Sequence, residues 1–181
     1  MPTKGILAYK EKLYIPLYIF LLFSVSIHKF LGFEYFTPIA LISPLLLFDF
    51  KDLGFTNYRS GFKWGIPFLF PAVLLFPSEG NIILVLNHAG VAFAEEMFFR
   101  GFLMRRYNNL TVSFLFTLPH IILYPSLGAI LTFFPSLLFG YLYMKTGSVL
   151  ASIFAHFSAN IFYMGITERF DMARLPWEIG F

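Results

Sequence analysis

Two adjacent carboxylates and a guanidinium lie inside a long apolar stretch of the sequence. They belong to Glu95, Glu96 and Arg100, and the apolar run around them begins near Ile82. Ionisable groups at bilayer depth cost several kcal/mol each, so as a rule they face a protein-lined cavity that has a function. Glu96 and Arg100 are four residues apart and can form an ion pair on one helix face. Glu95 points about 100° away, which leaves it free to act as a general base on water.

Two other apolar segments carry polar side chains at helical spacing. His156 and Asn160 share a helix face and offer imidazole and carboxamide N–H groups, the donors that stabilise an oxyanion. His120 follows Phe116 by four residues. At the helical rise per residue, Glu95, His120 and His156 each lie roughly 15 Å from the inner end of their segments, so we expect them at one level. Taken singly, each histidine could be a core residue and Asn160 a helix-packing residue.

Three short motifs, each on its own apolar segment, contain these polar residues. In chain order they are Glu95-Glu96-x-x-x-Arg100, Phe116-x-x-x-His120 and His156-x-x-x-Asn160. Together they resemble the CAAX protease and bacteriocin-processing family, the glutamate-type intramembrane proteases that include the Ras-converting endoprotease. The resemblance covers roughly Ile82 to Ile166, without a departure at any defining position.

The resemblance implies roles for four catalytic side chains. Glu95 and His120 would hold and deprotonate the attacking water, and His156 and Asn160 would form the oxyanion hole. No covalent acyl-enzyme is implied. The sequence has neither an HExxH motif nor a pair of cysteines, so we expect no metal and no other cofactor.

Three supporting residues follow from the same resemblance. Glu96 and Arg100 would shape the site and neutralise its charge, and Phe116 would pack under His120. The opposing interpretation is that both carboxylates are structural. One guanidinium neutralises two buried carboxylates poorly, which favours the functional interpretation.

Pro119 precedes His120 inside an apolar run that we expect to be helical. A proline within a helix removes one N–H group, so the carbonyl near Leu115 loses its helical partner. This predicts a kink, which either opens a wet pocket beside His120 or serves packing alone.

The composition is that of a membrane protein. Of 181 residues, 58% are hydrophobic and 13% are charged, against about 25% charged in soluble domains. The net charge of +3 comes without a basic stripe, so we expect no nucleic-acid partner. The chain has no cysteine, which excludes disulfides and thiol nucleophiles. The length fits a single integral membrane domain, residues 1–181.

Seven apolar runs are separated by charged or turn residues and predict an all-α bundle of about seven transmembrane or partly spanning helices. The runs are Leu13–Phe33, Thr37–Phe48, Phe62–Phe76, Ile82–Met104, Leu110–Tyr124, Leu127–Met144 and Val149–Ile166. The second and third are short and contain prolines, so they could span only half of the bilayer. The motifs fall within a catalytic core of about 82–166.

Lysine and arginine residues in the loops predict the orientation. With the N-terminus inside, nine lie on the inner side (Lys4, Lys10, Lys12, Lys51, Arg59, Lys63, Arg105, Arg106 and Lys145) and three on the outer side (Lys29, Arg169 and Arg174). The positive-inside rule then favours a cytoplasmic N-terminus in a prokaryotic cell membrane. The first run lacks a small-x-small cleavage site, so we expect it to be retained. Trp177 places the charged tail at the interface.

These observations favour an intramembrane endopeptidase whose partners are the lipid bilayer and a protein or peptide substrate. The substrate could be a prenylated C-terminal tail, a sorting tail of a surface protein, a bacteriocin leader or a membrane anchor. The compact chain resembles small prokaryotic members, for which the unprenylated substrates fit better. A non-catalytic binding, immunity or scaffold protein of the same fold is the main alternative. A proton-coupled carrier has less support because the two halves show no inverted repeat.

Overall fold

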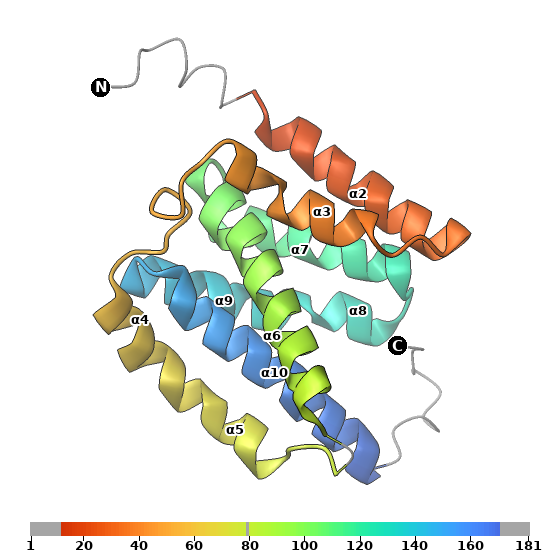
Figure 1. Ribbon diagram of the computed structural model, residues 1–181, viewed down its shortest axis with the longest axis vertical. Helices are drawn as coiled ribbons and strands as arrows, with labels where there is room; N and C mark the ends of the chain where they lie inside the picture. The colour runs from red at the N-terminus through yellow and green to blue at the C-terminus, as the bar shows by residue number, and fades with distance from the viewer. Residues whose placement is uncertain (1–11, 79, 171–181) are drawn as a thin grey trace.

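The computed structural model describes residues 12–78 and 80–170, and this part of the chain contains helices and no β-strand (Figure 1). Four helices are long and apolar enough to cross a membrane: Tyr14–Leu31, Ile82–Arg105, Leu127–Thr146 and Val149–Phe170. The predicted all-α fold is therefore confirmed, and the apolar helices fit an integral, multi-pass membrane protein.

The first crossing is a helical hairpin with a short return arm. Helix α2 (Tyr14–Leu31) ends at Gly32, which adopts a left-handed φ of 73°. The chain then turns back through α3 (Phe36–Ile42), which packs along α2, and continues into η1 (Ser43–Leu46). The apolar helix Phe36–Leu46 rises only about 16 Å and cannot cross a core of about 30 Å. The second predicted run therefore spans only partly.

The third predicted run is divided by its prolines into three short pieces. They are α4 (Tyr58–Gly65), η2 (Ile66–Phe68) and α5 (Leu69–Leu74), and they follow one another along α10. The helix begins at Tyr58, four residues before the predicted Phe62, directly after Asn57 in a left-handed conformation. This run also lacks one continuous spanning helix.

The motif with the two glutamates lies in the second half of the fourth predicted run, where the helix becomes buried. Helix α6 (Ile82–Glu96) continues without a break into the π-helical turn η3 (Met97–Phe102) and the short η4 (Leu103–Arg105). All six residues of η3 are buried. At Gly101 a β-carbon would lie 2.4 Å from the carbonyl oxygen of Leu53. Glycine therefore allows the loop that contains Leu53 to lie directly against this turn.

The remaining two motifs lie on helices that pack against this helical segment, one against α6 and the other against η3 and η4. Helix α7 (Asn109–Leu123) packs against α2 and α9, whereas α10 (Val149–Phe170) packs against α6 and α9. Between them, α8 (Leu127–Leu131) and α9 (Phe133–Thr146) form the third crossing. Helix α10 continues four residues past the predicted end at Ile166. Figure 1 shows α6 crossing α10 while α7 and α9 lie behind it.

Basic side chains contact the protein at both ends of the bundle. At one end Arg105 donates to the carbonyl of Asp52, and Lys145 lies 3.7 Å from the ring centre of Trp64. At the other end Lys29 donates to the carbonyl of Leu123, and Arg169 to that of Leu74. The cytoplasmic N-terminus stays a prediction, and four residues used for it or for the tail lie outside the described ranges: Lys4, Lys10, Arg174 and Trp177.

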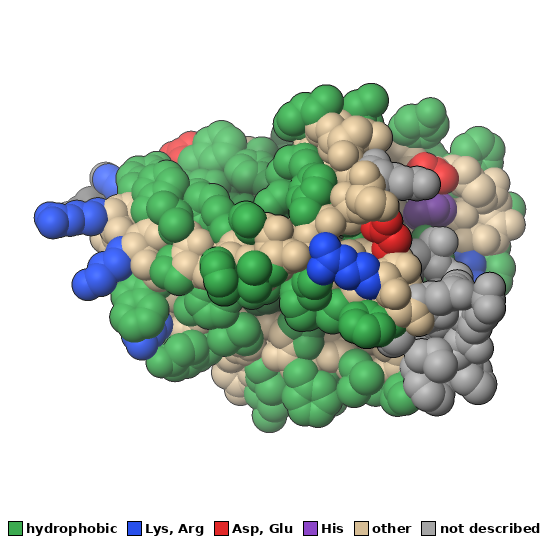
Figure 2. All heavy atoms as spheres, turned by 90° about the horizontal axis from the view of Figure 1, so that it is seen from below, with side chains coloured by type: hydrophobic (Ala, Val, Ile, Leu, Met, Phe, Trp, Pro, Cys, Tyr) green, Lys and Arg blue, Asp and Glu red, His purple; other side chains and the backbone are tan. Residues whose placement is uncertain are grey.

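Large apolar side chains cover much of the outer surface. Figure 2 shows them over most of one face, with several lysine and arginine side chains gathered at one end. Phe30, Leu46 and Val73 are 75%, 86% and 73% exposed. Contiguous apolar surface of this extent marks a membrane or protein contact, and helices of this length and composition fit a bilayer.

Candidate active site

Glu96, Arg100 and His156 form a closed, charged cluster in the interior. Glu96 and Arg100 are both fully buried, and Arg100 Nη1 donates to Glu96 Oε1 over 3.0 Å. His156 Nδ1 lies 2.8 Å from the same oxygen. The predicted ion pair is therefore confirmed, and the cluster also binds the histidine of α10. Buried charges persist only when they are paired in this way.

The second arm of the Arg100 guanidinium is held by α9. Its Nη2 donates to the carbonyl oxygen of Ser136 over 2.8 Å and to the Ser136 hydroxyl over 2.7 Å. The guanidinium carbon lies 4.9 Å from the ring centre of Phe116 and 5.4 Å from that of Phe139. Nε of Arg100 and Oε2 of Glu96 are buried without a hydrogen-bond partner in the described chain. The charges of the cluster are thus paired, but two of its buried polar atoms lack a hydrogen bond.

Ser136 and Phe139 belong to the site but were not predicted. Both come from the apolar run Leu127–Met144, in which they resemble ordinary packing residues. The only signal in the sequence is a small polar residue within an apolar helix, and other buried serines such as Ser113 and Ser152 share it. Their role follows from the packing of α9 beside Arg100, which the sequence does not reveal.

Two phenylalanine rings support the two histidines. His120 stacks on Phe116 with 4.7 Å between ring centres, and His156 stacks on Phe139 with 4.9 Å. Phe116 also presents its ring edge-on to His156 at 5.6 Å. The expected packing of Phe116 under His120 is present, and the same ring joins the two histidines.

The hydrogen bond of His120 defines which ring nitrogen is free. Nδ1 lies 2.9 Å from the carbonyl oxygen of Phe116. Because a carbonyl oxygen can only accept, Nδ1 carries the proton and donates it. In the neutral imidazole Nε2 therefore keeps its lone pair and can accept a proton from water.

The carbonyl that Pro119 leaves without a helical N–H accepts a hydrogen bond from another helix. The hydroxyl of Tyr18 on α2 donates to the carbonyl of Leu115 over 2.9 Å. This is the carbonyl that a proline four residues later leaves without a helical N–H. The freed carbonyl therefore anchors α2 to α7. Pro119 itself also lines a cavity beside His120, so the structure fits both the packing and the wet-pocket interpretation.

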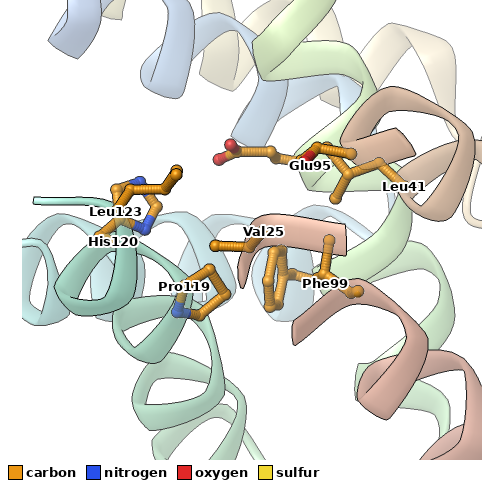
Figure 3. A pocket seen from close by; sticks show the side chains of 9 residues that line it. Val25, Leu41, Glu95, Phe99, Pro119, His120 and Leu123 are labelled. Atoms are coloured by element: carbon orange, nitrogen blue, oxygen red, sulfur yellow. The ribbon is translucent and has the colours of Figure 1, made fainter. Parts of the chain in front are cut away.

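Glu95 and His120 line one cavity between α2, α3, α6 and α7. Figure 3 shows the Glu95 carboxylate pointing to the side of the cavity where His120 lies. The other lining residues are mostly apolar: Leu21, Val25, Thr37, Leu41, Phe99, Pro119 and Leu123. The cavity offers water molecules about 40 Å³, and one water needs roughly 10–15 Å³ of such volume. It can therefore hold a few waters.

The Glu95 carboxylate lacks the side-chain hydrogen bonds that hold the Glu96 carboxylate. Its side chain is 17% exposed, and Oε2 is buried without a hydrogen-bond partner in the described chain. His156 Nε2 lies 3.7 Å from Oε2, within ion-pair range but beyond a hydrogen bond. Glu95 thus lies beside His156 and lines the same cavity as His120.

Asn160 lies one turn beyond His156 on α10 and is partly exposed. Its carboxamide shares no hydrogen bond with another side chain or backbone group of residues 12–78 and 80–170. The other six predicted site residues are joined by contacts, whereas the place of Asn160 in the site rests on its helical spacing from His156.

The described residues contain no group of three or more His, Asp or Glu side chains that could hold a metal ion. Both Nδ1 of His156 and Oε1 of Glu96 are occupied by their mutual contact. The side chains of metal-ligand type that line the cavity are the Glu95 carboxylate and the imidazole of His120.

A comparison with protein-family models matches the segment that contains the three motifs. Residues 77–162 match the family described as type II CAAX prenyl endopeptidase Rce1-like. This segment, 86 of the 181 residues, is similar to the Rce1-like family. The family consists of glutamate-type intramembrane proteases, a class that requires no metal cofactor. No curated protein and no solved structure matches the chain significantly.

Proposed function

We propose that the chain hydrolyses a peptide bond with a water molecule activated by Glu95 and His120. The observation that carries this proposal is their shared cavity, which has room for water and presents a carboxylate without a hydrogen-bond partner at Oε2 and an imidazole nitrogen. Both groups accept protons, as a general base must. The water loses a proton to this pair while its oxygen attacks the scissile carbonyl carbon, so no acyl-enzyme forms.

The oxyanion is stabilised by His156 and Asn160 in this proposal. Nδ1 of His156 is bound to Glu96, so donation to an oxyanion falls to Nε2. Nε2 donates only when both ring nitrogens carry protons. The carboxylates of Glu96, 2.8 Å from Nδ1, and Glu95, 3.7 Å from Nε2, are the groups that pair with such a charged ring. The carboxamide N–H of Asn160 supplies a second donor.

The supporting residues keep these groups in place. Glu96 and Arg100 neutralise one another and fix His156, and Phe116 packs under His120. No metal takes part in this mechanism. The residues 1–181 act as one membrane domain, with the catalytic core at about 82–166, in a prokaryotic cell membrane with the N-terminus in the cytoplasm.

The substrate is a membrane-associated protein or a C-terminal protein tail. The family description favours a prenylated C-terminal motif. The small volume of the cavity beside Glu95 fits water and leaves the lipid of such a tail outside it. An unprenylated sorting tail or leader peptide therefore remains chemically compatible with the same site.

The direct test is peptide cleavage by the full chain reconstituted in lipid vesicles. The panel contains a peptide with a prenylated C-terminal motif, its unprenylated twin, and a sorting-tail peptide with an apolar helix and a basic end. Products are identified by mass spectrometry. We expect Glu95→Gln and His120→Ala each to lower the cleavage rate by at least about 100-fold.

Glu34→Gln is the matched control, because Glu34 is 77% exposed in the loop after α2. It should cleave at the wild-type rate. Wild-type cleavage by Glu95→Gln would overturn the proposal. If cells rely on the protein and Glu95→Gln meets that need fully, the non-catalytic binding or scaffold role is favoured instead.

A further inference from the structure

A third polar group lines the cavity that contains Glu95 and His120. It is the hydroxyl of Thr37, on α3 and outside the matched segment 77–162. Its Oγ1 is buried and has no hydrogen-bond partner in the described chain. Several buried atoms share that property, but only Thr37 Oγ1 and Glu95 Oε2 among them also belong to residues lining this cavity.

The position of Thr37 in its helix explains why its hydroxyl has no local partner. Within helices, threonine hydroxyls commonly donate to the carbonyl four residues earlier. Thr117 does so to Ser113 over 3.0 Å, and Thr146 to Leu142 over 2.7 Å. Thr37 lies in the first turn of α3, which begins at Phe36, so no helical turn precedes it. A buried hydroxyl in a native protein needs another partner, which is either protein or ordered water.

The walls of the cavity favour water as that partner. Apart from Thr37, Glu95 and His120, every lining side chain is apolar. A buried water makes two to four hydrogen bonds, on average about three. Three polar side chains from α3, α6 and α7 supply that number, and the volume of about 40 Å³ is sufficient.

We propose that Thr37 is a positioning residue for the catalytic water, an inference that rests on the proposed function of this site. The water donates its two hydrogens to the Glu95 carboxylate and to His120 Nε2. Its oxygen accepts the Thr37 O–H on one lone pair, which leaves the other lone pair for the scissile carbonyl carbon. During attack the C–O bond forms and one proton passes to the Glu95–His120 pair. The site is thus completed by a helix outside the matched segment.

Substitution of Thr37 separates the hydroxyl from the shape of the side chain. Thr37→Val keeps the branched shape and removes the hydroxyl, whereas Thr37→Ser keeps the hydroxyl and removes a methyl group. With the prenylated or unprenylated peptide that the wild type cleaves, we expect Thr37→Val to lower kcat about tenfold, the loss of one oriented hydrogen bond, with KM unchanged. Thr37→Ser should retain kcat within about twofold.

The matched control is Thr167→Val. The hydroxyl of Thr167 donates to the carbonyl of Met164, near the end of α10 and away from the cavity. This variant should keep the wild-type kcat. An unchanged kcat in Thr37→Val would overturn the inference, as would a Thr37→Ser variant as impaired as Thr37→Val, because the methyl group would then be responsible.

A structural measurement tests the same inference without a substrate. A high-resolution structure of the wild-type chain in lipid should show a water within hydrogen-bond distance of Thr37 Oγ1 and of Glu95 or His120, and Thr37→Val should lose or shift it. A hydroxyl bound only to protein would overturn the inference. If Glu95→Gln keeps full activity, the proposed function fails; if Glu95→Gln is inactive and Thr37→Val is normal, only the role of Thr37 fails.

Discussion

Glu95 and Glu96 are neighbours in the chain but lie in two different regions of the site. Glu96 belongs to the closed cluster, where Arg100 and His156 share one of its oxygens and its side chain is fully buried. Glu95 lines the water-sized cavity, and its Oε2 has no hydrogen-bond partner in the described chain. The contrast shows how one helix separates two tasks: the tightly paired charge makes ionised groups tolerable in an apolar interior, and the carboxylate that is not hydrogen-bonded at Oε2 stays available for chemistry.

The largest effect on stability should come from breaking the closed cluster. Arg100→Met leaves the Glu96 carboxylate buried without its cation, and removal of one partner of a buried ion pair costs about 3–5 kcal/mol. Glu95→Gln should change the free energy of unfolding by less than about 1 kcal/mol, because active-site groups are seldom optimised for stability. Unfolding in mixed detergent and lipid micelles measures both.

Arg106→Met is the control for this contrast, because Arg106 is exposed at the end of the same helical segment. It should unfold like the wild type. Equal losses of stability in Arg100→Met and Glu95→Gln would contradict the division between the closed cluster and the cavity.

The hydroxyl of Ser136 offers a smaller perturbation of the closed cluster. Ser136→Ala removes one acceptor from Arg100 Nη2 but leaves the Ser136 carbonyl in place. We expect a loss of roughly 1.5 kcal/mol, at the low end for a hydrogen bond to a charged group, together with a modest fall in the cleavage rate. Ser26→Ala, which removes only a bond to the carbonyl of Leu22 within α2, should be close to neutral in the same unfolding measurement.

The Tyr18 hydroxyl joins α2 to α7, two of the helices that line the cavity. Tyr18→Phe leaves the Leu115 carbonyl without its donor, and side-chain hydrogen bonds between membrane helices are worth about 0.6 kcal/mol on average. We expect a loss of that size in the free energy of unfolding. Tyr35→Phe, at a side chain that is 82% exposed, should show none, and equal losses in both variants would contradict the role of this bond.

The smallest expected effect is that of a metal chelator. Catalysis by Glu95 and His120 alone predicts an unchanged cleavage rate after prolonged exposure to a strong chelator. A loss of activity that zinc or another divalent ion restores would favour a metal-dependent mechanism and would give the cavity a different role from the one proposed.

Much of the site could be predicted because it depends on spacing within single helices. The i, i+4 pair of Glu96 and Arg100 and the stacking of His120 on Phe116 follow from helix geometry alone. The seven apolar runs also match the observed helices closely. The two runs that form no continuous spanning helix, 37–48 and 62–76, are those whose length and prolines already indicated partial spans.

The rest depends on which helices become neighbours, and spacing along one helix contains no such information. Ser136 reaches Arg100 only because α9 lies beside η3, and Tyr18 reaches Leu115 only because α2 packs beside α7. The shared oxygen of Glu96, which binds Arg100 and His156 together, is a product of the same packing. The π-helical turn after Glu96 was also missed, since nothing in Met97–Phe102 distinguishes it from an ordinary helical turn.

The shortness of α7 has a consequence for the surrounding lipid. Asn109–Leu123 rises about 22 Å, less than the roughly 30 Å of a hydrocarbon core. A bilayer accommodates such a short helix by thinning, or flanking charged side chains extend to the headgroups. Lys29 donates to the carbonyl of Leu123 at the C-terminal end of α7. His120 lies about one turn from the same end. Water from the headgroup layer therefore has a short path to the imidazole, although His120 belongs to a helix inside the membrane.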